Sequence, residues 1–192
     1  MKTRLPLLLV FVSIALSFCA CENYNRTREI KKVQRAWIGK TIRFPADIQP
    51  ENSGKDTLWQ IQETPYKILL YIDSVGCTSC KLLLIVWNKL IEEVEADMKG
   101  QASFLFYFHP KDKKELNFIF RKDRFYHPVY IDDENEIGRL NKFPQQIEYQ
   151  CFLLNKDNRV VCIGNPTLNP YIWEMYKKII MTAPKQIKAL SP

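Results

Sequence analysis

Two near-continuous apolar runs stand in the middle of the chain, at residues 67–72 and 102–108. Runs of this length without polar alternation are typical of strands that are buried on both faces of a sheet. Between them, from Cys80 to about Met98, apolar side chains recur at helical spacing, and Gly100 follows as a stop signal. The pattern therefore predicts two neighbouring central strands connected by one long helix.

The same kinds of pattern predict the elements of the rest of the chain. Alternation and apolar runs predict strands, 3.6-residue spacing predicts helices, and Pro, Gly, Asn and Asp mark the turns. In chain order, the expected elements are an edge strand at 37–45 ended by Pro45, a loop at 49–56, a short strand at 58–62, an amphipathic helix at 112–121, a strand at 128–131, a short helix at 134–140, strands at 150–154 and 159–163, and a helix from Pro170 to about Met181.

The strands at 150–154 and 159–163 predict a hairpin with a two-residue turn at Asp157 and Asn158. That turn would place Leu153 opposite Cys162 and put Cys151 on the same face, one diagonal step away. A diagonal separation of about 7–8 Å is too wide for a relaxed disulfide. We therefore expect Cys151 and Cys162 to be two buried free thiols.

The order of elements implies an α/β fold with three layers, in which a central mixed sheet is covered by helices. With 192 residues and 46% apolar content, the chain has room for one ordinary domain, expected at 37–183. A polar, basic tether is expected at 22–36 and a C-terminal tail at 184–192.

The N-terminus predicts export. Lys2 and Arg4 precede an apolar run at residues 5–18, which is short for a membrane span but typical of a signal peptide. Cys21 follows the small residue Ala20, as in a bacterial lipoprotein signal whose cysteine is lipidated; Cys19 is the alternative. An ordinary cleaved signal and an uncleaved anchor helix stay open. The preferred interpretation is a lipid-anchored envelope protein that faces the periplasm or the cell exterior.

The net charge of +7 is a mild excess, and much of it lies in residues 26–43. This stretch could lie on anionic lipid headgroups or act as a solvated tether. An export signal and the lack of a recognition motif argue against nucleic-acid binding.

Cys77 and Cys80 form the single C-x-x-C of the chain, between the expected first central strand and the long helix. One such pair lacks the second pair of ligands that a structural zinc site needs, and His109 and His127 fit no zinc spacing, so we expect no metal. A thiolate at a helix N-terminus is stabilised and becomes nucleophilic. In an exported protein, the motif therefore predicts redox chemistry.

Three stretches, residues 67–84, 128–137 and 151–161, resemble the thioredoxin superfamily, and more specifically the membrane-anchored thioredoxin-like lipoproteins of bacterial envelopes. The resemblance implies thiol–disulfide exchange on protein disulfides or dithiols, with an envelope protein as electron donor and no metal or organic cofactor. Cys77 would be the nucleophile and Cys80 the resolving thiol. Thr78 and Ser79 would tune the pair.

The chain also departs from that pattern. Gly76 and Ser79 stand where active members usually carry Trp and Pro, and Tyr149 stands where they carry a cis-proline. Because a cis bond before a non-proline residue costs about 3 kcal/mol, we expect a trans bond before Tyr149. Some thioredoxins carry a buried acid six residues before the first cysteine, and Tyr71 stands at that position here. Asp73 is expected on the same strand face, nearer the cysteines.

The role of Asp73 stays open between a proton acceptor for Cys80 and a turn or capping residue. His109 ends a central strand and is expected at the same sheet edge as Cys77. Two alternative functions also stay open: a redox-inactive binding module that keeps the fold, and a peroxidase.

Overall fold

The computed structural model describes residues 27–52, 63–74 and 82–189, with the side chains of the last helix described to residue 182. The chain divides into two compact units, residues 1–37 and 38–192. The described part of the first unit is a helix at 27–37, where the sequence predicted a tether. Cys19 and Cys21 lie outside the described residues. Within those residues, no helix is both long enough and apolar enough to cross a membrane.

The second unit is built on one mixed sheet with the strand order β1-β4-β3-β2-β5-β6. β2 pairs in parallel with β3, β3 in parallel with β4, and the other neighbours are antiparallel. The strands are β1 (Glu51–Asn52), β2 (Tyr66–Ile72), β3 (Ala102–Phe108), β4 (Pro128–Ile131), β5 (Cys151–Asn155) and β6 (Val160–Ile163). The predicted mixed sheet is therefore confirmed.

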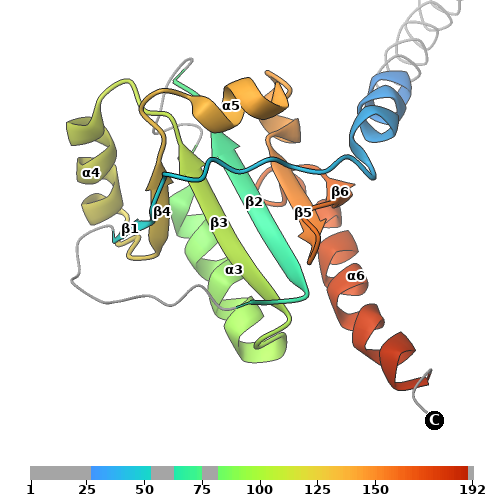
Figure 1. The fold of residues 1–192 in the computed structure, drawn as a ribbon. Coiled ribbons are helices and arrows are strands. Elements are labelled where there is room, and N and C mark those ends of the chain that lie inside the picture. Colours follow the sequence, from blue (N-terminus) through green and yellow to red (C-terminus); the bar gives the residue numbers. More distant parts are fainter. Residues whose placement is uncertain (1–26, 53–62, 75–81, 190–192) are drawn as a thin grey trace, which may run out of the picture. The chain divides into compact units, whose positions relative to one another are not determined.

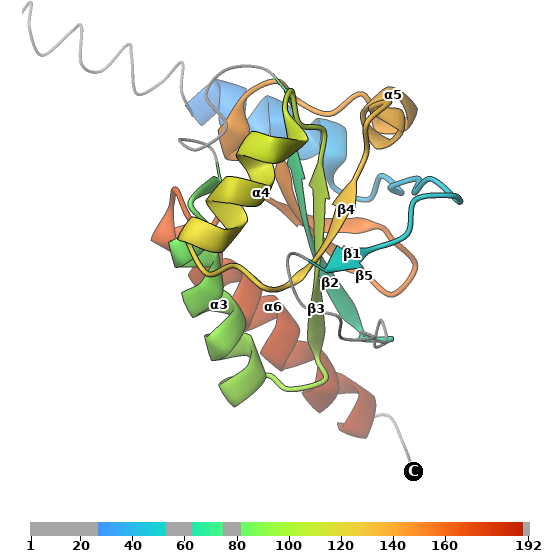
Figure 2. The same cartoon turned by 90° about the vertical axis from the view of Figure 1, so that its left-hand side faces the viewer.

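Helices cover both faces of the sheet (Figures 1 and 2). The helices α3 (Leu84–Asp97), α4 (Lys113–Lys122) and α6 (Pro170–Ala189) lie on one face, and α5 (Glu136–Asn141) lies on the other. The predicted three-layer α/β/α architecture is confirmed.

The core under α3 follows from alternation along the strands. Phe104 and Phe106 project from β3 toward Trp87 of α3, whose ring meets theirs edge-on at centroid distances of 6.2 and 5.5 Å. Trp87 is fully buried. Burial of a large apolar side chain is worth about 1.5–3 kcal/mol, and edge-on aromatic pairs add to this. These contacts fix α3 against the central strands.

Two N-terminal expectations were wrong. Residues 37–45 form no strand; Trp37 ends the helix at 27–37, and only one isolated bridge joins Thr41 to Arg159. Within the stretch expected as a loop at 49–56, Glu51–Asn52 forms β1, which pairs with β4. β1 depends on pairing with a strand more than 70 residues away in the chain, which the local sequence pattern does not show. Residues 58–62, expected as a strand, lie outside the described residues.

Within the described residues, Leu82 is helical and the long helix α3 begins at Leu84, while Cys80, the predicted start, lies outside the described residues. Leu83 has the left-handed backbone conformation, with φ 44°, and so interrupts a regular helix at this position. A left-handed residue other than Gly costs roughly 1–2 kcal/mol, a cost that sequence periodicity does not reveal. At the other end of the chain, α6 continues to Ala189, through residues expected as a tail.

The hairpin between β5 and β6 confirms one expectation and corrects another. Leu153 pairs with Cys162 as predicted, but Leu154 pairs with Val160, so the register shifts between Leu153 and Leu154. The turn is therefore one residue longer than expected at its base, and a bulge restores the predicted pairing further along the hairpin.

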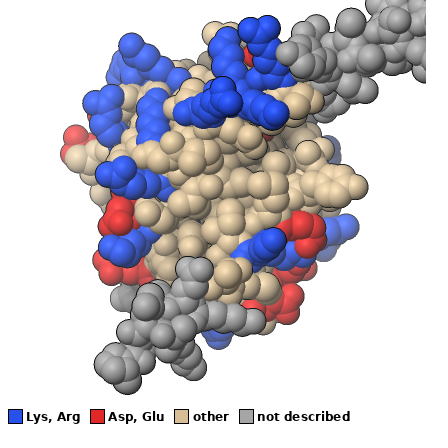
Figure 3. Space-filling view, turned by 90° about the vertical axis from the view of Figure 1, so that its right-hand side faces the viewer, with Lys and Arg blue, Asp and Glu red and all other residues tan. Residues whose placement is uncertain are grey.

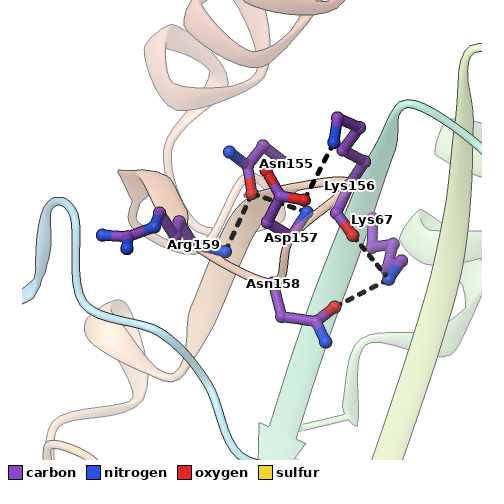
Figure 4. Close-up of polar contacts among 6 residues, drawn as sticks. All are labelled: Lys67, Asn155, Lys156, Asp157, Asn158 and Arg159. Atoms are coloured by element: carbon purple, nitrogen blue, oxygen red, sulfur yellow. Dashed lines mark hydrogen bonds and ion pairs between the residues drawn. The ribbon is translucent and has the colours of Figure 1, made fainter.

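Side chains hold this turn (Figure 4). The Asn155 Oδ1 atom accepts hydrogen bonds from the backbone N–H groups of Asp157 and Arg159, at 3.0 and 2.9 Å. Asn158 takes a left-handed backbone with φ 60°, which Asn tolerates better than most residues. Its Oδ1 atom accepts a hydrogen bond of 2.7 Å from Lys67 Nζ of β2. Local hydrogen bonds thus select the longer turn.

Candidate functional site

The expected thiol pair follows the carboxyl end of β2. Cys77, Thr78, Ser79 and Cys80 lie outside the described residues, between Ser74 and Leu82. Described groups flank this stretch at the end of β2. Four side chains near the end of β2 form what we call the Asp73 cluster: Tyr71, Asp73, Asn135 and Gln150.

Gln150 holds the Asp73 carboxylate. The Gln150 side chain is 0% exposed, and its Nε2 atom donates to Asp73 Oδ2 at 3.1 Å and to the Pro144 carbonyl at 3.0 Å. Its backbone carbonyl accepts from Tyr71 N at 2.9 Å. Among the described residues, the buried Gln150 Oε1 atom has no hydrogen-bond partner. Gln150 thus joins the loop before β5 to the end of β2.

Tyr149 lies in the loop that precedes β5. It ends a short 3-10 helix, η1 (Ile147–Tyr149), and its N–H donates to the Gln146 carbonyl at 2.9 Å. The described residues contain no cis peptide bond, so the predicted trans bond before Tyr149 is confirmed. Gln150 was not predicted as a site residue from the sequence; its signal was a polar side chain directly before a buried strand, where a polar group requires partners.

Tyr71 is tied to the opposite layer. Its hydroxyl donates to Asn135 Oδ1 at 2.8 Å, and a Cβ atom on Gly138 would lie only 2.6 Å from that hydroxyl. Glycine is therefore needed at position 138 for α5 to approach β2. Burial, followed by the charge of Asp73, raises the pKa of Tyr71 to about 12. Tyr71 is thus a protonated hydrogen-bond donor at neutral pH.

His109 lies at the carboxyl end of β3, while Cys77, with which it was predicted to share a sheet edge, lies outside the described residues. The His109 backbone N–H donates to the Ile72 carbonyl at 2.9 Å, which places it beside the end of β2. Its Nδ1 atom is 2.9 Å from the Asp132 carbonyl. The buried Asp132 carboxylate in turn accepts from the N–H groups of Glu136 and Ile137, both at 2.8 Å, and so caps α5.

His127 is not part of this group. It lines a cavity of about 530 Å³ beside α3 and the first residues of β3. Burial lowers its pKa, and the charges of Glu95 and Glu92 oppose this effect.

Cys151 and Cys162 are free and buried, as predicted. They belong to the core beneath α6, where the Tyr176 hydroxyl lies 3.9 Å from Cys151 Sγ and donates to the Gly164 carbonyl at 2.9 Å. Burial raises the pKa of both thiols. A thiol that stays protonated is a poor nucleophile, so this pair has the character of packing residues.

The described residues contain no cluster of three or more His, Cys, Asp or Glu side chains that could hold a metal ion. The described polar groups at the end of β2 are the Asp73 carboxylate and the Gln150 amide that donates to it.

No family model and no curated protein matches the chain. Solved structures do match it. A thioredoxin-like protein in its oxidised form superposes with a TM-score of 0.53 at 10% identity, covering 76% of this chain and 97% of that one. The chain has a thioredoxin-like fold.

Two further structures share this fold. A putative protein disulfide isomerase from Bacteroides thetaiotaomicron gives a TM-score of 0.50 at 10% identity, covering 74% of this chain and 87% of its own. The bacterioferritin comigratory protein of Xanthomonas campestris, studied for alkyl peroxide reduction, gives 0.50 at 15% identity, covering 73% and 99%. The likeness is in architecture, since these identities are low.

Proposed function

We propose that this protein carries out thiol–disulfide exchange on protein partners through Cys77 and Cys80. The observation that carries the proposal is the position of Asp73 at the carboxyl end of β2 in a thioredoxin-like fold, since the sequence continues from it into the C-x-x-C. Sites in open α/β sheets gather at this end of the strands.

In the reducing direction, the Cys77 thiolate attacks one sulfur of the partner's disulfide. The partner's S–S bond breaks, a mixed disulfide forms, and the other partner sulfur leaves as a thiolate. The Cys80 thiolate then attacks the Cys77 sulfur and releases the second partner thiolate. The partner gains two electrons, and a Cys77–Cys80 disulfide remains. An envelope dithiol protein reduces this disulfide again, and no metal or organic cofactor takes part.

Asp73 is the proposed proton acceptor for Cys80. Its carboxylate is half-buried and held by Gln150, so it can keep one orientation without being cut off from solvent. A carboxylate fixed beside a thiol lowers the cost of deprotonation by taking up the proton. Thr78 and Ser79 are proposed to tune the pair through hydrogen bonds and turn geometry.

We place this chemistry in the cell envelope. The hydrophobic run at residues 5–18 and the cysteines that follow it support export and lipidation at Cys21, with Cys19 as the alternative.

A second candidate is a redox-inactive binding module. The trans bond before Tyr149 and the η1 turn favour it, because the loop that pairs with substrate in the related family has a different backbone here. Such a module would bind its partner without turnover.

The deciding experiment measures reduction of insulin disulfides by the protein with dithiothreitol as donor. Cys77→Ser should abolish turnover, while the control Cys162→Ala, in the buried pair, should retain it. The reduction potential of the Cys77–Cys80 pair should fall between about −270 and −120 mV, the range of known exchangers. A potential well below about −300 mV, without turnover, would mean a structural bridge and favour the binding module.

A further inference from the structure

A group of cations comes together on the side of the second unit that carries α5. Lys40 and Arg43 belong to the segment before β1, while Arg139 and Lys142 belong to α5 and its C-terminal end. Arg159, in the turn before β6, donates from Nη1 to the Gly39 carbonyl at 3.3 Å. All five side chains belong to exposed residues. We call these five residues the basic surface.

Hydrogen bonds fix this surface. Lys40 Nζ donates to the Asn141 carbonyl at 3.0 Å, and the Arg43 guanidinium donates to the Leu140 carbonyl. The buried Asn141 side chain accepts from Arg43 N at 2.9 Å and donates to the Arg43 carbonyl at 2.8 Å. The cations are therefore held in place by the end of α5, where positive charge is favoured.

Like charges approach one another here. Burial, and then the charges of Arg43 and Lys142, lower the pKa of the Lys40 ammonium. Within the described ranges, no salt bridge joins Arg43, Arg139, Lys142 or Arg159 to a carboxylate.

Two other lysines of the second unit form salt bridges with carboxylates. Lys113 pairs with Asp133, and Lys177 pairs with both Glu93 and Glu174. Figure 3 shows one side of the protein, where Lys and Arg side chains predominate in the upper part and Asp and Glu side chains lie lower down and at the edge. The charges of Arg43, Arg139, Lys142 and Arg159, which no described carboxylate neutralises, are suited to an anionic partner.

We infer that the basic surface docks on an anionic lipid bilayer. The inference rests on the proposed membrane-anchored location. A bilayer is favoured over an acidic protein because the basic surface includes the end of a basic stretch of sequence that leads from the proposed anchor. Residues 26–43 carry seven cations and a single acid, Glu29. Lys40 follows Cys21 by fewer than twenty residues, of which 27–37 are helical, so an anchor there keeps the surface within about 45 Å of the headgroups.

The test uses the full-length lipidated protein, reconstituted in vesicles of phosphatidylcholine alone or of an equimolar mixture with phosphatidylglycerol. A membrane-impermeant amine reagent modifies exposed lysines, and mass spectrometry gives the rate at each one. We expect Lys40 and Lys142 to react several-fold more slowly on the anionic vesicles, and Lys178 of α6 to react equally on both. The protection should disappear at high salt, since the Debye length falls from about 8 Å at physiological ionic strength to about 3 Å at 1 M.

Matched variants complete the design. Arg139→Glu/Lys142→Glu should abolish the protection of Lys40, while Lys122→Glu/Lys178→Glu, with the same change in net charge, should keep it. Equal Lys40 rates on both vesicles would overturn the inference, as would protection that appears only when an acidic protein is added.

Flotation of the same samples separates the two proposals. Failure to float with phosphatidylcholine alone would count against the anchor, whereas flotation on both vesicles without protection would count against the basic surface only. Thiol exchange should be unchanged in both double variants.

Discussion

Gln150 Nε2 lies 3.1 Å from Asp73 Oδ2 and thereby connects the first residue after β2 to the residue before β5. The contact closes a loop of 77 residues at the sheet edge that leads into Cys77 and Cys80. The contact joins a fully buried amide to a half-buried carboxylate. Its loss should therefore lower the free energy of unfolding and change the surroundings of Asp73 at the candidate site.

Gln150→Ala removes the donors to Asp73 and to the Pro144 carbonyl. Leaving buried partners unsatisfied costs about 1–3 kcal/mol, so we expect the free energy of unfolding to fall by that amount. Urea unfolding of the variant measures it. The exposed neighbour Gln145 is the control, and Gln145→Ala should change stability by less than about 0.5 kcal/mol. An equal loss in both variants would contradict the assigned role of Gln150.

Tyr71→Phe should change the response to alkali. Because the folded pKa is about 12 and the ordinary pKa is 10.0, the phenol of Tyr71 stabilises the fold fully below pH 10. That contribution is lost as the pH rises from 10 through 12, where the unfolded chain ionises first. Stability measured over this window should fall less steeply in the variant than in the wild type. Identical slopes would show that Tyr71 titrates normally.

At neutral pH, the same Tyr71→Phe variant should also lose the hydrogen bond to Asn135. The expected cost is about 0.5–1.5 kcal/mol, read from urea unfolding near pH 7. A variant at the exposed Tyr126, Tyr126→Phe, provides the comparison for removal of a phenol hydroxyl.

His127 should make the protein sensitive to acid. Burial lowers its folded pKa below the ordinary 6.5, so the neutral form is favoured in the fold. Its contribution to stability is complete above pH 6.5 and is lost as the pH falls through the folded pKa. His127→Gln should therefore flatten the dependence of thermal midpoint on pH below 6.5. A variant that loses stability just as steeply would assign the acid sensitivity to other groups.

Asp132→Ala should destabilise α5. The carboxylate accepts two backbone N–H bonds in the first turn of that helix, and loss of such a cap costs about 0.5–2 kcal/mol. Chemical unfolding measures the loss. Asp133→Ala, which removes an exposed ion pair with Lys113, should cost about 0–1 kcal/mol. If the Asp133 variant were the less stable of the two, the capping role of Asp132 would be wrong.

Cys151 and Cys162 should resist alkylation in the folded protein. Both thiols are buried and burial raises the pKa of each, so little thiolate is present at neutral pH. Peptide mapping after iodoacetamide treatment should find both unmodified in native buffer and fully modified in denaturant. Rapid modification of Cys151 in the native protein would reopen a redox role for it.

The sequence by itself determined the central architecture of this protein. Residues 67–72 and 102–108 predicted β2 and β3 because strands buried on both faces must be apolar throughout, and the spacing around Trp87 predicted α3 for the same reason. The C-x-x-C can also be identified from the sequence alone, because its two cysteines are close together in the chain.

Only the tertiary structure decided what depends on distant partners. β1 exists because Glu51 and Asn52 pair with Val129 and Pro128. Gln150 meets Asp73, and Lys40 and Arg43 meet the end of α5, across 77 to about 100 residues of chain. Hydrophobic periodicity shows which face of an element is buried, but it does not show which distant polar group forms a hydrogen bond with that element. For this reason the sheet and its helices follow from the sequence, while the Asp73 cluster and the basic surface follow from the fold.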